Sequence, residues 1–139
     1  MGKITTVSEG GAVMHPQARR RPQRISEFHE KLKSLGFKSY QEYLASEHWI
    51  SLRKRYWQSK LPKRCHGCGL TQGLQLHHRK YARLGEERLN DLILVCSDCH
   101  REIHAYEKRT GQNMWGVTNI VLRAKRKALK NQREAAAQR

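Results

Sequence analysis

Four cysteines in two matched pairs constrain this 139-residue chain more than any other feature. Cys65 and Cys68 form one C-x2-C pair, and Cys96 and Cys99 form a second pair after 27 intervening residues. Two such pairs on tight turns can surround one metal ion with four thiolates, and this spacing is typical of structural zinc sites. Disulfide pairing would require an oxidising compartment, and the N-terminal sequence shows no apolar export signal. We therefore predict a closed, structural Zn²⁺ site at these four cysteines and a cytoplasmic location.

The charge of the chain indicates the class of its partner. The sequence contains 28 Lys and Arg against 12 Asp and Glu, a formal net charge of +16. The excess lies at the two ends, because residues 1–24 and 109–139 each contain very few acidic residues. Basic ends of this kind typically contact a phosphate backbone without reading its sequence. Because the sequence has no long apolar run, we expect no membrane-spanning segment. We therefore expect a nucleic acid and not a membrane as the partner.

The segment 25–62 has the pattern of short helices. A helix is predicted over 26–35, and Gly36 is expected to end it. Ser39 is followed by Glu42 in a capping-box pattern, and Ser46 has the position of a third N-cap. Residues at helical spacing predict one apolar, core-facing stripe after Ser46. That stripe consists of Trp49, Leu52 and Tyr56.

The cysteine-framed segment predicts two strands and a helix. Residues 74–78 alternate like a strand, residues 92–95 form a β-favouring run, and Ser97 or Asp98 can cap a helix through about Lys108. A C-terminal helix is expected from about Thr118, with one apolar side. That side consists of Val117, Val121, Ala124 and Ala128. The expected fold class is α+β, with a disordered basic arm (1–24), a helical lead-in (25–62), a core (63–108), and a basic helix and tail (109–139).

Four histidines lie within or beside the cysteine frame. His77 and His78 are neighbours at the end of the first predicted strand, so their side chains point to opposite sides or diverge. His100 and His104 are four residues apart on the predicted helix and therefore share one face. One strand histidine can join the helix pair as a metal ligand while the other serves as a base. A divalent ion beside a neutral imidazole suits hydrolysis of a phosphodiester.

These residues together resemble a known family. The stretch from Cys65 to His104, including "LQLHHRKYARLGEERLNDLILVCSDCHREIH", is similar to zinc-stabilised HNH endonucleases of phages and mobile elements. The resemblance implies a ββα-metal core, also called a His-Me finger, and metal-dependent cutting of DNA. By position, His78 matches the general base of that family, and three further histidines match positions that hold the catalytic divalent ion. Those three are His77, His100 and His104.

The sequence differs from the family motif at the central asparagine. Its expected position, five residues before the third cysteine, is occupied by Asp91, with Asn90 beside it. The asparagine of the family holds the loop by hydrogen bonds and orients the base. A carboxylate can accept such bonds but cannot donate as an amide does. Either Asp91 or Asn90 can fill the role, and both remain candidates at this point.

The sequence thus predicts a metal-dependent DNA endonuclease that nicks or cuts both strands. The catalytic ion is expected to be Mg²⁺, Mn²⁺, Ni²⁺ or Zn²⁺. Small proteins of this family often lie beside phage packaging genes, so a phage origin and a terminase partner are further expectations. The alternative is a non-catalytic, zinc-stabilised nucleic-acid-binding module. DNA is favoured over RNA because no aromatic base-stacking platform is evident, and Glu86 and Glu87 are expected at the surface. Residues expected to contact nucleic acid are Arg79, Lys80, Arg83, Arg123, Arg126, Lys127 and Lys130.

Overall fold

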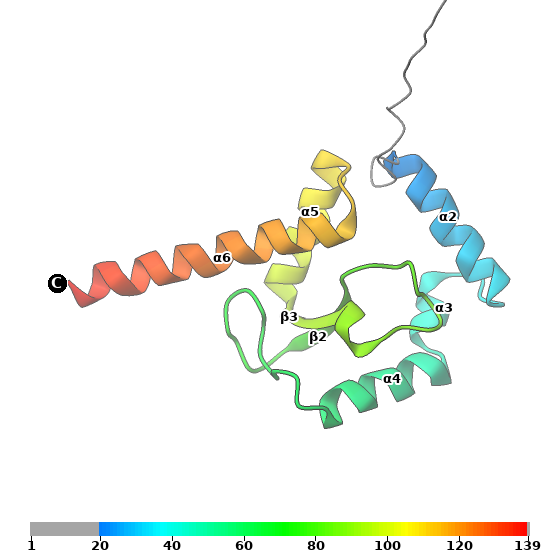
Figure 1. Cartoon of the computed structure of the whole chain (residues 1–139), viewed down its shortest axis with the longest axis horizontal. Coiled ribbons are helices and arrows are strands. Elements are labelled where there is room, and N and C mark those ends of the chain that lie inside the picture. The colour runs from blue at the N-terminus through cyan, green and yellow to red at the C-terminus, as the bar shows by residue number, and fades with distance from the viewer. Residues whose placement is uncertain (1–19, 139) are drawn as a thin grey trace, which may run out of the picture.

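A two-stranded antiparallel sheet lies at the centre of the computed structural model, which describes residues 20–138 (Figure 1). Strand β2 (Leu74–His78) pairs with β3 (Leu92–Cys96), so that His78 lies opposite Leu92 and Leu74 lies opposite Cys96. A short 3-10 helix, η2 (Leu89–Asp91), leads directly into β3. Helix α5 (Ser97–Thr110) follows β3 without a connecting loop. The mixed α+β class and both expected strands are therefore confirmed.

Three helices precede the sheet, and the two expected serine caps are present on the second and third. The helices are α2 (Arg21–Ser34), α3 (Tyr40–Leu44) and α4 (Glu47–Gln58). The Ser39 hydroxyl accepts from the Glu42 backbone N–H at 3.0 Å, and the Ser46 hydroxyl accepts from the Trp49 N–H at 3.2 Å. Residues 1–19 of the expected arm lie outside the described residues. Helix α2 starts at Arg21, five residues before the predicted start at residue 26, and a proline in its first turn favours this earlier start.

The sheet is covered on both faces, which explains why every residue of β3 is buried. Leu92 and Leu94 point to a core that contains the predicted stripe of α4, and this stripe is confirmed as buried. Ile93 and Val95 point to the opposite face and pack there with side chains of α5 and α6, including Ile103. Side chains alternate along a strand, so consecutive residues within β3 belong to different cores.

Helix α5 begins differently from the prediction. The Cys96 sulfur accepts from the Cys99 N–H at 3.4 Å and caps the helix, whereas Ser97 is already its first residue. The predicted N-cap at Ser97 or Asp98 is therefore wrong, because the cysteine pair itself forms the cap. The helix ends at Thr110, and Gly111 caps it with a φ of 70° that glycine readily adopts.

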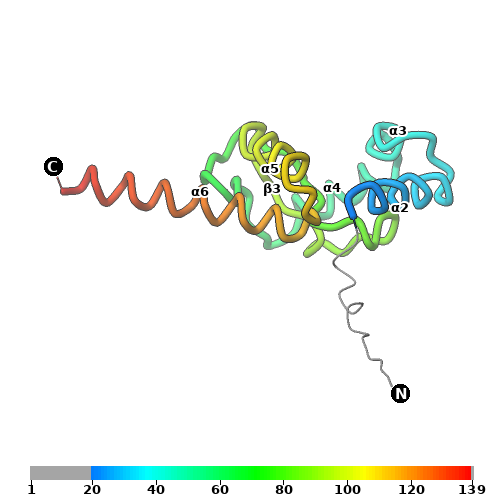
Figure 2. Tube along the Cα trace, turned by 90° about the horizontal axis from the view of Figure 1, so that it is seen from above, coloured from blue at the N-terminus to red at the C-terminus, as the bar shows by residue number. Residues whose placement is uncertain are grey.

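The C-terminal helix, α6 (Met114–Ala137), starts four residues before its expected position because Asn113 caps it. The Asn113 side-chain oxygen accepts from the Gly116 N–H at 2.9 Å. The buried residues of α6 are Val117, Thr118 and Leu122, all near its start. Ala124 and Ala128, expected on the apolar side, are exposed. The second half of α6, which contains Ala128, extends beyond the rest of the molecule (Figures 1 and 2). Among the described residues, no helix has the length and apolar character required to span a membrane.

Candidate metal centres and active site

The four cysteines converge on one point, as the sequence predicted. Their sulfur atoms all lie within 4.8 Å of one another, and the Cys68 and Cys96 sulfurs are 3.6 Å apart. Sulfurs bound to one Zn²⁺ at about 2.3 Å are about 3.8 Å apart in a tetrahedron, so the cluster has the dimensions of a four-thiolate site. Burial raises the pKa of Cys65, but backbone N–H groups around its sulfur outweigh burial and bring the pKa to about 7. The cluster can therefore hold a structural zinc ion.

Gly67 allows the first cysteine turn to approach the second. A Cβ at this position would lie 2.9 Å from the Cys99 sulfur and 3.0 Å from Leu122 of α6. Any side chain here would therefore push the two cysteine pairs apart or displace α6. The close approach of the two cysteine pairs therefore requires glycine at this position.

Three histidines form a second cluster on the other side of the sheet from His78. His77 of β2 and the α5 pair, His100 and His104, place their ligand nitrogens within 4.8 Å of one another. The Nε2 atoms of His100 and His104 are 3.0 Å apart. Two imidazole nitrogens on one Zn²⁺ are about 3.3 Å apart in tetrahedral geometry, so the three residues fit one divalent ion. We call His77, His100 and His104 the histidine trio.

Neighbouring side chains orient the rings of the histidine trio. The Thr118 hydroxyl of α6 lies 3.0 Å from His77 Nε2, and the Gln75 side-chain oxygen lies 2.6 Å from His100 Nδ1. Since the Gln75 oxygen accepts from Nδ1–H, the lone pair of His100 is on Nε2, which faces His104. Such outer partners fix the tautomer of a metal-binding histidine. Sequence reasoning did not identify Gln75, which is exposed, or Thr118, which is buried, because a single polar residue forms no motif.

Burial keeps the histidine trio in its neutral, metal-binding form. It lowers the pKa of His77 well below the usual range, and His100 and His104 nearby lower it further. Burial and the neighbouring His104 lower the pKa of His100 to about 4. His104 itself is exposed, whereas His77 is only 2% exposed. An ion held here would therefore be open to solvent on the His104 side, as a catalytic site requires.

His78 points to the opposite face and is enclosed there. Its Nδ1 lies 2.8 Å from the Tyr40 hydroxyl, and its Nε2 lies 2.7 Å from a Glu87 carboxylate oxygen. Its ring stacks between Trp49 and Tyr81, with ring centroids 4.8 Å and 5.3 Å away. The side chain is 1% exposed. The strand alternation expected for the two neighbouring histidines is confirmed, and it separates His78 from the histidine trio.

Glu87 is a buried anion, and its expected surface position is wrong. Its carboxylate accepts from His78, from His48 at 2.8 Å, from the Tyr43 hydroxyl, and from the Gly85 N–H at 3.0 Å. Burial raises its pKa, but the side-chain hydrogen bonds from His78, Tyr43 and His48 outweigh this and lower the pKa to about 2. Because the ionised carboxylate accepts from His78 Nε2–H, the lone pair of a neutral His78 is on Nδ1.

Asp91, and not Asn90, is the residue that holds the loop between the strands. Its carboxylate is 1% exposed and accepts two hydrogen bonds from Arg83, at 2.9 Å and 2.7 Å. It also accepts from the Arg88 N–H at 3.0 Å, and its backbone oxygen accepts from the Arg79 N–H. Asn90 is exposed. Asp91 thus links Arg83, the Arg88 turn and the backbone of Arg79.

The basic residues expected to contact nucleic acid differ in their availability. Arg83 is held by Asp91, and Arg79 and Lys80 lie over the Trp115 ring at 4.1 Å and 5.1 Å from its centroid. In α6, Arg126 donates to the His66 backbone oxygen at 2.6 Å but remains exposed. Three more side chains are exposed on α6 and share one face of it at helical spacing. They are Arg123, Lys127 and Lys130.

Comparisons of the whole chain with family models, with curated proteins and with solved structures give no match. The resemblance to HNH endonucleases therefore depends on the motif residues alone. The assignment of two clusters that could hold a metal ion depends in turn on the geometry described above.

Proposed function

We propose that this protein is a metal-dependent DNA endonuclease of the HNH type. The histidine trio is the observation that carries the proposal, because it presents three neutral imidazoles on a strand–helix pair with one side open to solvent. The cysteine cluster also supports the proposal. Because the cysteines can hold a structural zinc ion by themselves, the histidine trio is not needed for that purpose. The net charge of +16 supports a polyanionic substrate. A partnership with phage packaging proteins stays a prediction that rests on the family resemblance.

The chain's own residues suit hydrolysis of a phosphodiester. A divalent ion held by the histidine trio would supply Lewis-acid stabilisation of the charge that develops on the phosphate. Thr118 and Gln75 hold the ligand rings in place. Arg79 and Lys80, on the loop that follows β2, lie over the exposed Trp115 ring and would contact the phosphate backbone of the substrate.

His78 is our candidate for the proton acceptor, at its Nδ1 atom. Glu87 keeps a proton on Nε2, so Nδ1 is the nitrogen with a free lone pair, and it currently accepts from Tyr40. Burial raises the pKa of Tyr40 far above its usual range, so the hydroxyl keeps its proton and donates it. A water molecule that takes the place of the Tyr40 hydroxyl would donate to the same nitrogen. Because His78 is enclosed, this exchange requires the Tyr40 side of the site to open.

One observation favours a second function. Both His78 nitrogens are hydrogen-bonded and the side chain is 1% exposed, which is the arrangement of a structural histidine. A zinc-stabilised module that binds nucleic acid without cutting it would have such a residue. The two functions differ in whether His78 is needed for cleavage or only for folding.

Cleavage of supercoiled plasmid by the purified protein tests the proposal. The reaction is run with EDTA and with added Mg²⁺, Mn²⁺, Ni²⁺ or Zn²⁺, and a nick is distinguished from a double-strand break by product form. We expect cleavage that requires metal and that His104→Ala abolishes, because His104 is an exposed member of the trio. His29→Ala is the matched control, since His29 is also exposed and belongs to neither metal-binding cluster. DNA binding without cleavage under every metal would instead support the binding module.

A further inference from the structure

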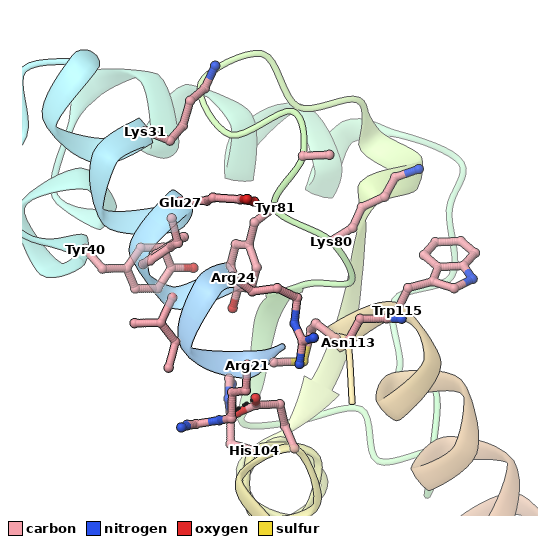
Figure 3. A pocket seen from close by; sticks show the side chains of 15 residues that line it. Arg21, Arg24, Glu27, Lys31, Tyr40, Lys80, Tyr81, His104, Asn113 and Trp115 are labelled. Atoms are coloured by element: carbon pink, nitrogen blue, oxygen red, sulfur yellow. Dashed lines mark hydrogen bonds and ion pairs between the residues drawn. The ribbon is translucent and has the colours of Figure 1, made fainter. Parts of the chain in front are cut away.

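A cavity of about 940 Å³ opens beside His104 and lies between α2, the loop after β2 and the start of α6 (Figure 3). Aromatic side chains from separate parts of the chain line it. Phe28 and Tyr81 meet edge to face with centroids 4.9 Å apart, and Phe28 and Tyr40 meet similarly at 5.3 Å. Trp115 lies at the α6 side of the cavity and is 42% exposed. The sequence showed no aromatic platform because these residues are up to 87 positions apart.

The charges around the cavity favour an anionic ligand. Four basic side chains line it, from α2 and from the loop after β2, against two acidic ones. Arg21 is bound to Glu107 at 2.7 Å, so these two charges offset each other and three basic side chains remain against one acidic one. In Figure 3, Arg21 and His104 lie at one end, while Lys80 lies beside Trp115. The four basic residues are Arg21, Arg24, Lys31 and Lys80.

We propose that this cavity binds one unpaired nucleotide of a DNA substrate. The base would stack against the aromatic residues, and its phosphates would lie near the basic side chains. Stacking on aromatic rings is how proteins hold single-stranded bases without sequence preference. A base inside a duplex is already stacked on its neighbours and must leave the helix before it can enter a pocket.

The position of the cavity connects it with the proposed reaction, on which this inference rests. His104 belongs both to the histidine trio and to the cavity lining. A nucleotide in the cavity would therefore place an adjoining phosphate next to the trio. The structure thus assigns to this protein a preference for DNA that contains an unpaired nucleotide, such as a bulge or a single-stranded stretch.

Fluorescence anisotropy measures this preference without depending on cleavage. The probes are a labelled 20-base-pair duplex and the same duplex with one unpaired nucleotide at its centre, and both are checked for integrity afterwards. We expect the zinc-loaded protein, without other added metal, to bind the second probe about tenfold more tightly, the size typical of one base–aromatic stack. Equal affinity for the two probes would overturn the inference.

Two matched pairs of variants locate the site. Trp115→Ala should remove most of the tenfold preference, whereas Trp57→Ala should keep it, since Trp57 is 44% exposed on α4 and does not line the cavity. Lys31→Glu should weaken binding of the unpaired probe, whereas Lys33→Glu, also exposed on α2 but outside the cavity, should weaken it less. Circular dichroism confirms that each variant is folded. If Trp115→Ala and Trp57→Ala keep the same preference, the cavity is not the site.

The binding and plasmid results separate this inference from the proposed function. A preference for the unpaired probe that depends on Trp115, without cleavage under any metal, supports the cavity and contradicts the nuclease. Metal-dependent cleavage with no such preference supports the nuclease and contradicts the cavity.

Discussion

Replacement of Glu87 by alanine is expected to destabilise the fold strongly. The substitution leaves the buried Tyr43 hydroxyl and His78 Nε2–H without their acceptor, since the Glu87 side chain is fully buried. Each buried donor without a partner costs about 1–3 kcal/mol. The contact with His48 adds less, because the His48 side chain is 37% exposed. We therefore expect a loss of about 3–5 kcal/mol, a large part of the 5–15 kcal/mol typical of a domain.

The lowered pKa of Glu87 indicates a contribution of similar size to the free energy of unfolding. A pKa of about 2, against about 4.3 for a free glutamate, corresponds to about 3 kcal/mol in favour of the ionised, folded state. Because this pKa is lowered by folding, the contribution is complete above about pH 5 and is lost as the pH falls towards 2.

Urea unfolding of the zinc-loaded protein, followed by circular dichroism, measures the effect. The matched control is Glu86→Ala, since the neighbouring Glu86 is exposed and should change stability by less than about 0.5 kcal/mol. If Glu87→Ala and Glu86→Ala lose the same small amount, the buried carboxylate does not hold His78 and the loop as described.

Four further outcomes are expected. Between pH 5 and pH 2.5, the stability of Glu87→Gln should fall less steeply than that of the wild type in urea titrations; parallel curves would contradict the pKa of Glu87. Asp91→Asn should lose about 1–3 kcal/mol in the same assay because Arg83 loses its bidentate partner, whereas Asp98→Asn, at a side chain 73% exposed, should be nearly neutral. A strong chelator should unfold the protein and zinc should restore it, because structural zinc contributes about 10–16 kcal/mol; an unchanged circular dichroism spectrum would refute this. Lys127→Gln and Lys130→Gln should each reduce the slope of log DNA affinity against log salt concentration by about one, the contribution of one phosphate contact, whereas Ala128→Gln should leave the slope unchanged.

Local patterns in the sequence were sufficient to predict which cysteines and which histidines cluster together. The first cysteine pair lies on a turn and the second at the junction of β3 and α5, and the C-x2-C spacing brings the sulfurs of each pair together. Strand alternation alone separates His77 from His78. The i, i+4 spacing on a helix then brings His100 next to His104. Each of these inferences needs only the geometry of one element, and that geometry does not depend on how the rest of the chain packs.

The surroundings of His78 could not be predicted in the same way. Glu87 is buried only because the loop after β2 folds against α3 and α4, which bring Tyr43 and His48 to it from 44 and 39 residues away. Nothing in the residues next to Glu87 distinguishes it from the exposed Glu86. The start of α6 was missed for a local reason, since Gly116 lowers helix propensity while the Asn113 cap offsets it.

Cobalt substitution tests the central claim most directly, namely that the chain builds two chemically distinct metal sites. Titration of the metal-free protein with Co²⁺, followed by its absorption spectrum, reports thiolate and imidazole coordination separately. We expect two ions per chain, with His104→Ala losing only the imidazole-bound ion and keeping the thiolate spectrum. A single ion per chain in both the wild type and His104→Ala would show that the histidine trio holds no metal and would contradict the proposed active site.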